Sequence, residues 1–398
     1  MTGKRYYLTI LILGSLTAIV PFSIDMYLPG FKAIAGELKT TVPDVALSLS
    51  SFFIGVSVSQ LFYGPLLDRF GRKRPLYLGL TIYILSSIAC VIVGSLDALI
   101  ALRFVQAIGA CAAQVAAFAM VRDIFPVEDN AKVFSSLMLV LSASPLIAPT
   151  AGGYLIAHFG WHAVFFVLAA ISLIVMIAVW RGLPESSKPD PNYSLKPASI
   201  LGNYWEVIRN RQFFTYALSG AIGFSGLFIY ISCSPSVFLE FYKVSEQTYG
   251  WIFALLASGI ILATQTNRLV LKYFSSAQII QGALITQTIF GVLLVLATYN
   301  NWIGLPGMLV LLFLFLACAG FVLPNSSAMC MQPFTRNAGS ASALMGALQM
   351  GIGSLGSFLV SRFHGNSPLP MAAGMAIFAA VALTLLLTTS KKIQPVTA

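Results

Sequence analysis

The amino-acid sequence predicts an all-α integral membrane protein whose twelve transmembrane helices form two six-helix bundles. Three observations support this fold class. Hydrophobic residues make up 58% of the 398-residue chain and charged residues only 9%, whereas a soluble domain carries about 25% charged residues. Twelve segments are apolar over the roughly 20 residues that a membrane helix requires. One long polar connection separates six of these segments from the other six.

The N-terminal half contains the first six segments. The first follows Lys4 and Arg5, as in a signal peptide, but its apolar run is too long and no A-x-A cleavage site follows, so we expect an uncleaved membrane helix. Segments of this composition form helices because lipid offers no partners for free backbone groups. The six spans lie near residues 7–30, 46–67, 75–95, 98–121, 132–157 and 162–182.

The polar connection runs from Pro184 to Gln212 and contains four prolines and charges of both signs. We therefore predict an N-terminal bundle over 1–182, a cytoplasmic linker over 183–211 and a C-terminal bundle over 212–398. The spans of the second half lie near residues 212–238, 247–269, 277–298, 303–329, 338–361 and 369–390. Two halves of six helices are typical of a duplicated transporter with a site between the halves, and we expect such a chain to work as a monomer.

Basic residues predict the orientation. With both termini in the cytoplasm, 18 of the 23 lysines and arginines fall on the cytoplasmic side, four fall outside and Arg103 lies within a span. Cytoplasmic loops of membrane proteins are enriched in lysine and arginine, so this asymmetry favours both termini inside. It also accounts for the net charge of +10. The composition therefore excludes a soluble enzyme and gives no reason to expect a nucleic-acid partner.

Cysteines and histidines predict no metal site. The five cysteines lie in apolar stretches without a C-x-x-C pair, as core residues do. His158 and His162 have a spacing that a metal site can use, but they flank a predicted helix boundary with no carboxylate nearby. The candidates for function are therefore charged and polar residues in the spans and at their ends.

Two charged residues, Asp25 and Arg103, lie inside predicted spans. A charge at the bilayer centre costs on the order of 2.5–3.5 kcal/mol on insertion scales, so such residues indicate function. At ~1.5 Å per residue, both lie roughly 8 Å inside the outer boundary. The pair has two interpretations: a structural ion pair, or a switch in which Asp25 binds a proton in one conformation and releases it in another. The switch predicts one proton per cycle, and its cancelling charges suit a neutral or zwitterionic substrate.

Other polar and small residues extend this candidate site. Gln106 and Gln114 follow Arg103 at helical spacing and form a stripe that faces either a cavity or another helix. The fifth span combines residues that kink a helix with residues that allow close approach, for a pivot or for simple packing: Pro145, Pro149, Gly152 and Gly153. Candidate residues of a substrate cavity are Tyr27, Gln106, Gln114, Phe224, Phe228, Tyr230, Asn325 and Gln349.

The most specific motif runs from Gly64 to Arg74 with the sequence GPLLDRFGRKR. We expect it to fill the loop between the second and third spans, where Gly64 and Gly71 permit a tight turn and close backbone approach. Asp68 and the basic residues suit contacts with helix ends. The candidate gate residues are Gly64, Asp68, Arg69, Gly71 and Arg72, with Arg122 and Asp123 at the end of the fourth span.

This motif resembles the signature of the major facilitator superfamily, G-x-L-x-D-R-x-G-R-[KR]-[KR]. Residues 102–109 (LRFVQAIG) resemble the fourth-helix motif of its proton-coupled members. Residues 148–153 (APTAGG) resemble the fifth-helix motif of its antiporters, with the small Ala148 in place of a glycine. Residues 25–29 (DMYLP) resemble the bicyclomycin-resistance (Bcr/CflA-type) drug:proton antiporters. The resemblance covers the whole chain by topology, and its sharp motifs lie in the first half.

The resemblance implies the major facilitator fold and an exporter of amphipathic drugs or metabolites in the bacterial inner membrane. Such an exporter is driven by the proton gradient and needs no cofactor. It also implies that Asp123 pairs with Arg72 and that such contacts hold the cytoplasmic side closed. Two alternatives stay open: a proton-coupled uptake symporter for a small nutrient, and a membrane-embedded enzyme, which the scattered acidic residues disfavour. Antibiotic, siderophore, amino-acid derivative and sugar export all fit this sequence.

Overall fold

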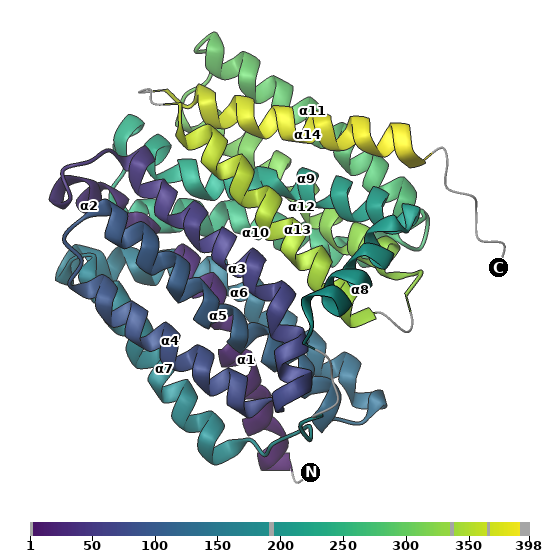
Figure 1. Cartoon of the computed structure of the whole chain (residues 1–398). Coiled ribbons are helices and arrows are strands. Elements are labelled where there is room, and N and C mark those ends of the chain that lie inside the picture. Colours follow the sequence, from purple (N-terminus) through teal and green to yellow (C-terminus); the bar gives the residue numbers. More distant parts are fainter. Residues whose placement is uncertain (1–2, 191–194, 335–337, 364–366, 391–398) are drawn as a thin grey trace. The chain divides into compact units, whose positions relative to one another are not determined.

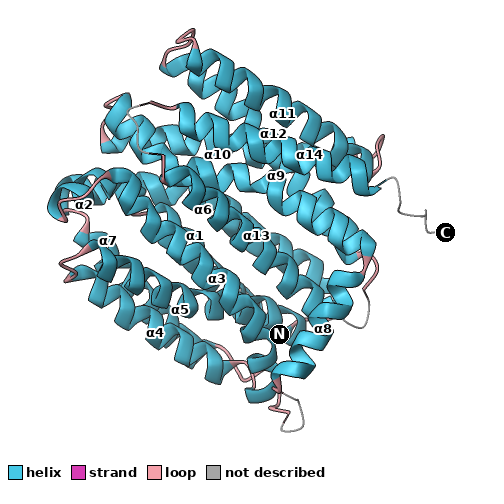
Figure 2. Ribbon diagram, turned by 45° about the horizontal axis from the view of Figure 1, so that its top comes forward, coloured by secondary structure: helices cyan, strands magenta, loops and turns pink. Residues whose placement is uncertain are grey.

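The computed structural model describes residues 3–190, 195–334, 338–363 and 367–390, and every regular element in these ranges is helical (Figure 2). Within them, twelve helices are long and apolar enough to cross a membrane, which confirms the predicted fold class. The chain is therefore a multi-pass membrane protein. The orientation of its two termini stays a prediction from the basic residues.

The spanning helices follow the chain in the order that the sequence predicts (Figure 1). Those of the first half are α1 (Gly3–Asp25), α3 (Val42–Phe70), α4 (Lys73–Val91), α5 (Leu96–Ile124), α6 (Val127–Phe159) and α7 (His162–Gly182). Those of the second half are α9 (Arg211–Pro235), α10 (Glu246–Val270), α11 (Ser276–Tyr299), α12 (Leu305–Met331), α13 (Ala338–Ser361) and α14 (Leu369–Ser390).

Four short elements lie outside the predicted spans or alter their ends. The first span divides, because α1 ends at Asp25 and the chain continues through the 3₁₀ turn η1 (Leu28–Gly30) into α2 (Phe31–Glu37). The helix α8 (Pro197–Arg209) lies within the segment that the sequence predicts as a linker. A π-helical turn, η2 (Ser236–Phe241), extends α9. Hydropathy over windows of membrane-helix length does not show η1 and η2, because Arg5–Glu37 and Arg211–Phe241 each pass as one apolar span.

The described chain forms two compact units: Met1–Ile200 with Ser245–Phe253, and Leu201–Val244 with Ala254–Ala398. In the first unit, α1 packs against α5, α6 and α7, and α4 packs against α5 and α7. In the second unit, α9 packs against α12, α13 and α14, and α11 packs against α12 and α14. Each of these helix pairs in the second unit has a counterpart in the first unit whose two helices come six spans earlier in the chain. A duplicated architecture requires this correspondence.

Glycines bring α3 and α4 close to α5, the helix that carries Arg103. A Cβ atom on Gly55 of α3 would lie 2.6 Å from the Ala107 Cβ, and one on Gly109 of α5 would lie 2.5 Å from the Gly79 carbonyl oxygen of α4. Small residues permit this close approach of membrane helices. The same approach brings Gly109 against Tyr83, since a Cβ atom on Gly109 would lie 2.6 Å from the Tyr83 backbone nitrogen.

Candidate functional site

The polar centre of the first unit is the guanidinium of Arg103, which has no exposed surface. Its central carbon lies 4.3 Å from the ring centroid of Tyr27, 4.3 Å from that of Phe52 and 5.7 Å from that of Phe165. These rings come from the turn after α1, from α3 and from α7. Aromatic faces attract a cation most strongly where water is absent. The fold therefore surrounds this buried charge with aromatic rings from three parts of the unit.

Neutral oxygen atoms complete the environment of Arg103. Its Nη2 donates to the Ser23 carbonyl oxygen at 2.7 Å, and its Nη1 donates to Gln106 Oε1. Gln106 Nε2 in turn donates to Ser87 Oγ at 2.7 Å. The hydroxyl groups of Ser23 and Tyr83 share a hydrogen bond of 2.6 Å. This network joins α1, α4 and α5 around the charge, and its acceptors carry no formal negative charge.

Asp25 lies at the last residue of α1 and is 3% exposed. Its Oδ1 atom has no hydrogen-bond partner. In the part of the chain that the structure describes, it is the one buried carboxyl group, and its oxygens lie more than 4 Å from the nitrogens of Arg103. The ion pair that the sequence allows is therefore absent from this conformation. The helix ends at Asp25, and the ring of Tyr27 covers the guanidinium instead.

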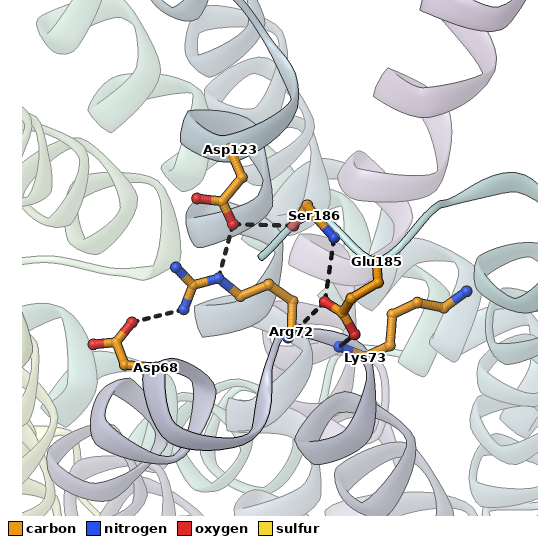
Figure 3. Close-up of polar contacts among 6 residues, drawn as sticks. All are labelled: Asp68, Arg72, Lys73, Asp123, Glu185 and Ser186. Atoms are coloured by element: carbon orange, nitrogen blue, oxygen red, sulfur yellow. Dashed lines mark hydrogen bonds and ion pairs between the residues drawn. The ribbon is translucent and has the colours of Figure 1, made fainter. Parts of the chain in front are cut away.

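The connection between α3 and α4 holds an ion-pair cluster (Figure 3). Arg72 Nη1 lies 2.7 Å from Asp68 Oδ1, and Arg72 Nε lies 2.8 Å from Asp123 Oδ2 at the end of α5. The second pair is the one that the family resemblance implies. Partial burial works to lower the pKa of Arg72, but the hydrogen bonds and charges of Asp123 and Asp68 outweigh it and raise that pKa. The cluster ties α3, α4 and α5 together through one guanidinium.

The connection between α3 and α4 is shorter than the motif of residues 64–74, which the sequence predicts to fill it. Only Gly71 and Arg72 separate α3 from α4, and Gly71 has φ +81°, a conformation that favours glycine. Gly64 does not form part of a turn, which corrects the prediction, because the hydrogen-bond ladder of α3 continues to Phe70. A Cβ atom on Gly64 would meet no atom within 4 Å. Arg122 is exposed near the end of α5.

Two residues that sequence reasoning missed complete the cluster. Both oxygens of Glu185 accept backbone N–H groups, from Arg72 at 2.8 Å and from Lys73 at 3.1 Å. Ser186 Oγ donates to the same Asp123 oxygen that Arg72 contacts, at 3.0 Å. Arg69 Nη1 also donates to the carbonyl oxygen of Asp190, at 3.4 Å. The sequence did contain a signal for an acidic partner: three basic residues stand at the start of α4, where a helix N-terminus favours a carboxylate.

The prolines and glycines of the predicted pivot lie within α6. Pro145 and Pro149 are inside this helix, and both Gly152 and Gly153 follow in its last third. A Cβ atom on Gly152 would lie 2.8 Å from the Met26 carbonyl carbon. Close approach at Gly152 therefore places α6 directly against the residue that follows Asp25.

The remaining candidates fall into two groups. Tyr27 and Gln106 are fully buried against Arg103, whereas Gln114 is half-buried with its Oε1 atom unpartnered. In the second unit, Phe224 and Phe228 meet edge to face with ring centroids 5.6 Å apart. Tyr230 is buried on the same helix, and Gln349 is half-buried on α13. The last candidate, Asn325, donates to Asn267 Oδ1 at 2.7 Å. The structure thus places Tyr27 and Gln106 against Arg103 and distributes the second-unit candidates over α9, α12 and α13.

Comparison with known proteins adds a family to this geometry. The family model described as Major Facilitator Superfamily matches residues 13–357. The chain is 29% identical over 368 residues to the bicyclomycin resistance protein homolog of Haemophilus influenzae, covering 92% of each chain. It is 28% identical over 375 residues to the multidrug resistance protein MdtL of Klebsiella pneumoniae, covering 94% of this chain and 93% of that one. It also matches the crystal structure of a D-xylose-proton symporter with a TM-score of 0.76, 13% identity and 98% of each chain covered, a likeness in fold.

Proposed function

The chain belongs to the Major Facilitator Superfamily, and from this premise we propose that it exports small amphipathic drugs or metabolites in exchange for protons, by alternating access. It is a multi-pass transporter of the bacterial inner membrane rather than an enzyme. Two of its relatives are named as a bicyclomycin resistance protein homolog and a multidrug resistance protein, which supports efflux as the direction of transport.

The separated charges of Asp25 and Arg103 carry the proposal of proton coupling. Asp25 is buried with an unpartnered oxygen, and the two terminal nitrogens of Arg103 donate to Gln106 and Ser23 rather than to Asp25. A buried charge is expensive without a partner, so a carboxyl group in this position is suited to bind a proton and to release it when the surroundings change. Asp25 is therefore the proposed proton carrier, and Arg103 is the group that its ionised form meets in another conformation.

The contact between Gly152 and Met26 supplies a connection from this carboxyl group to helix movement. A change in α6 shifts the backbone next to Asp25, because the two segments have no space between them. Movement of α6 thereby changes the surroundings of the carboxyl group. Binding of substrate and release of a proton are coupled if both favour the same position of α6.

The substrate class follows from charge and surface. The two membrane charges of the first unit, Asp25 and Arg103, cancel when Asp25 is ionised, and aromatic rings surround Arg103. Small neutral or zwitterionic compounds with an apolar face match these properties, and bicyclomycin is a suitable first compound because of the relative named for it.

Inside-out membrane vesicles test the proposal. Respiration acidifies the lumen, and a fluorescent pH dye follows the release of protons when a compound is added outside. We expect bicyclomycin or a phenicol to release protons in wild-type vesicles and not in Asp25→Asn vesicles. Asp97→Asn is the matched control, since Asp97 is an exposed carboxyl group at the start of α5.

Two results contradict the proposal. Equal proton release from wild-type and Asp25→Asn vesicles would place the coupled proton on another residue. Release that occurs only when the compound is loaded into the lumen would indicate symport, because both species then leave in the same direction.

A further inference from the structure

The helix α4 begins without a cap of its own. Its N-cap residue, Arg72, lacks a side-chain capping hydrogen bond, and Lys73 and Arg74 follow at the positive end of the helix dipole. Positive charges in this position are unfavourable, and the first N–H groups of a helix need acceptors. The sequence around this helix end therefore requires a carboxylate from elsewhere in the chain.

Glu185 supplies that carboxylate from a segment more than a hundred residues away. We propose that residues 183–186, here called the strap, are a positioning element that keeps the Arg72 cluster formed, with Glu185 as its anchor. Glu185 accepts the N–H groups of both Arg72 and Lys73, and the Lys73 ammonium donates to the Leu183 carbonyl oxygen at 2.8 Å. Figure 3 shows the carboxylate of Glu185 directed at the start of α4.

The strap supports both the backbone and the side chain of Arg72. Glu185 fixes its backbone, while Ser186 Oγ holds the Asp123 oxygen that accepts from the Arg72 side chain. Gly71 leaves little freedom beside them, since a Cβ atom there would lie 3.3 Å from the Glu185 carboxylate and 3.2 Å from the Ser187 carbonyl oxygen. Displacement of the strap therefore removes two supports of the guanidinium at once.

The strap begins immediately after α7, which ends at Gly182. A shift at this end of α7 moves Glu185 relative to α4, so the ion-pair cluster responds to the last spanning helix of the first unit. The polar connection after the sixth span thus helps to hold the candidate gate residues Gly71 and Arg72 in place. This inference deepens the proposed function and rests on it only where transport is measured.

Hydrogen–deuterium exchange of the purified full-length protein tests the inference without any substrate. We expect Glu185→Ala to speed exchange in peptides covering the start of α4 by about fivefold, the effect of losing a cap of about 1 kcal/mol. Glu185→Gln keeps one acceptor and should give a smaller increase. Glu206→Ala, which removes an exposed carboxylate on α8, is the matched control and should leave this region unchanged. Unchanged exchange in Glu185→Ala and Glu185→Gln would overturn the inference.

A double-mutant comparison separates positioning from simple stability. If Glu185 acts through Arg72, Glu185→Ala lowers the rate of compound-induced proton release in the wild type and has no further effect in Arg72→Ala. Additive losses would overturn the link to Arg72. A wild-type protein without compound-induced release would count against the proposed function, whereas the exchange experiment still decides the role of the strap.

Discussion

Arg103→Lys tests whether the hydrogen bonds and aromatic contacts of the Arg103 guanidinium matter beyond its positive charge. Lysine keeps the positive charge but loses the planar fork that donates to both Ser23 and Gln106. Losing one hydrogen bond to a charged group costs about 1.5–3 kcal/mol. Weaker stacking on Tyr27 and Phe52, each 4.3 Å from the guanidinium, adds up to about 2 kcal/mol. Since part of the attraction to the rings survives, we expect a total loss of about 2–4 kcal/mol.

The assay is thermal unfolding of the purified protein in detergent, followed by tryptophan fluorescence. A loss of this size lowers the melting temperature by roughly 5–15 °C for a unit of about 200 residues. Arg122→Lys provides the control, because Arg122 lies on the same helix and is exposed. An Arg103→Lys protein that melts with the wild type would refute the reasoning, as would an equal loss in Arg122→Lys.

Three further predictions follow from the same structure. Gly109→Ala should destabilise the protein by about 1–3 kcal/mol, since its Cβ would lie 2.5 Å from the Gly79 carbonyl oxygen. Gly64→Ala should stabilise it by about 0.5–1 kcal/mol, because a Cβ atom there meets no other atom within 4 Å. Equal melting temperatures of the two variants would contradict the close packing of α4 and α5. With Asp25 as the one buried carboxyl group in the described residues, one proton should cross per substrate molecule, and a measured ratio clearly above one would contradict this. The pKa of Arg72 is raised above its usual value, so the stability that Arg72 contributes is complete below its usual pKa and is lost only as the pH rises above it. The difference in melting temperature between wild type and Arg72→Ala should therefore stay constant from about pH 6 to about pH 9. A steep change in that difference within this range would contradict the prediction.

The sequence predicts the helices well because each span is set by its own hydropathy. Long apolar segments must form helices in lipid, so all twelve spans could be placed without knowing their neighbours. The division of the first span was not predictable in this way. Hydropathy joins α1 and α2 into one apolar span, Arg5–Glu37, and the Pro29-Gly30 pair was the sequence signal for a turn. The structure adds that Met26, just after α1, packs against Gly152 of α6.

The candidate site was predictable in its members but not in its contacts. Charge within a span identifies Asp25 and Arg103, because such residues are costly unless they serve a function. Hydropathy does not show which helix faces meet, so the rings of Phe52 and Phe165 could not be assigned to Arg103. The role of Glu185 depends on a contact between distant parts of the chain, which local patterns do not record.

The most direct test of the account is proton release from purified protein in weakly buffered detergent solution. A compound that releases protons in the vesicle assay is added at saturation, and a pH-sensitive dye counts the protons released per protein. The account predicts about one proton from the wild type and none from Asp25→Asn. Equal release from both proteins would contradict the claim that Asp25 carries the coupled proton.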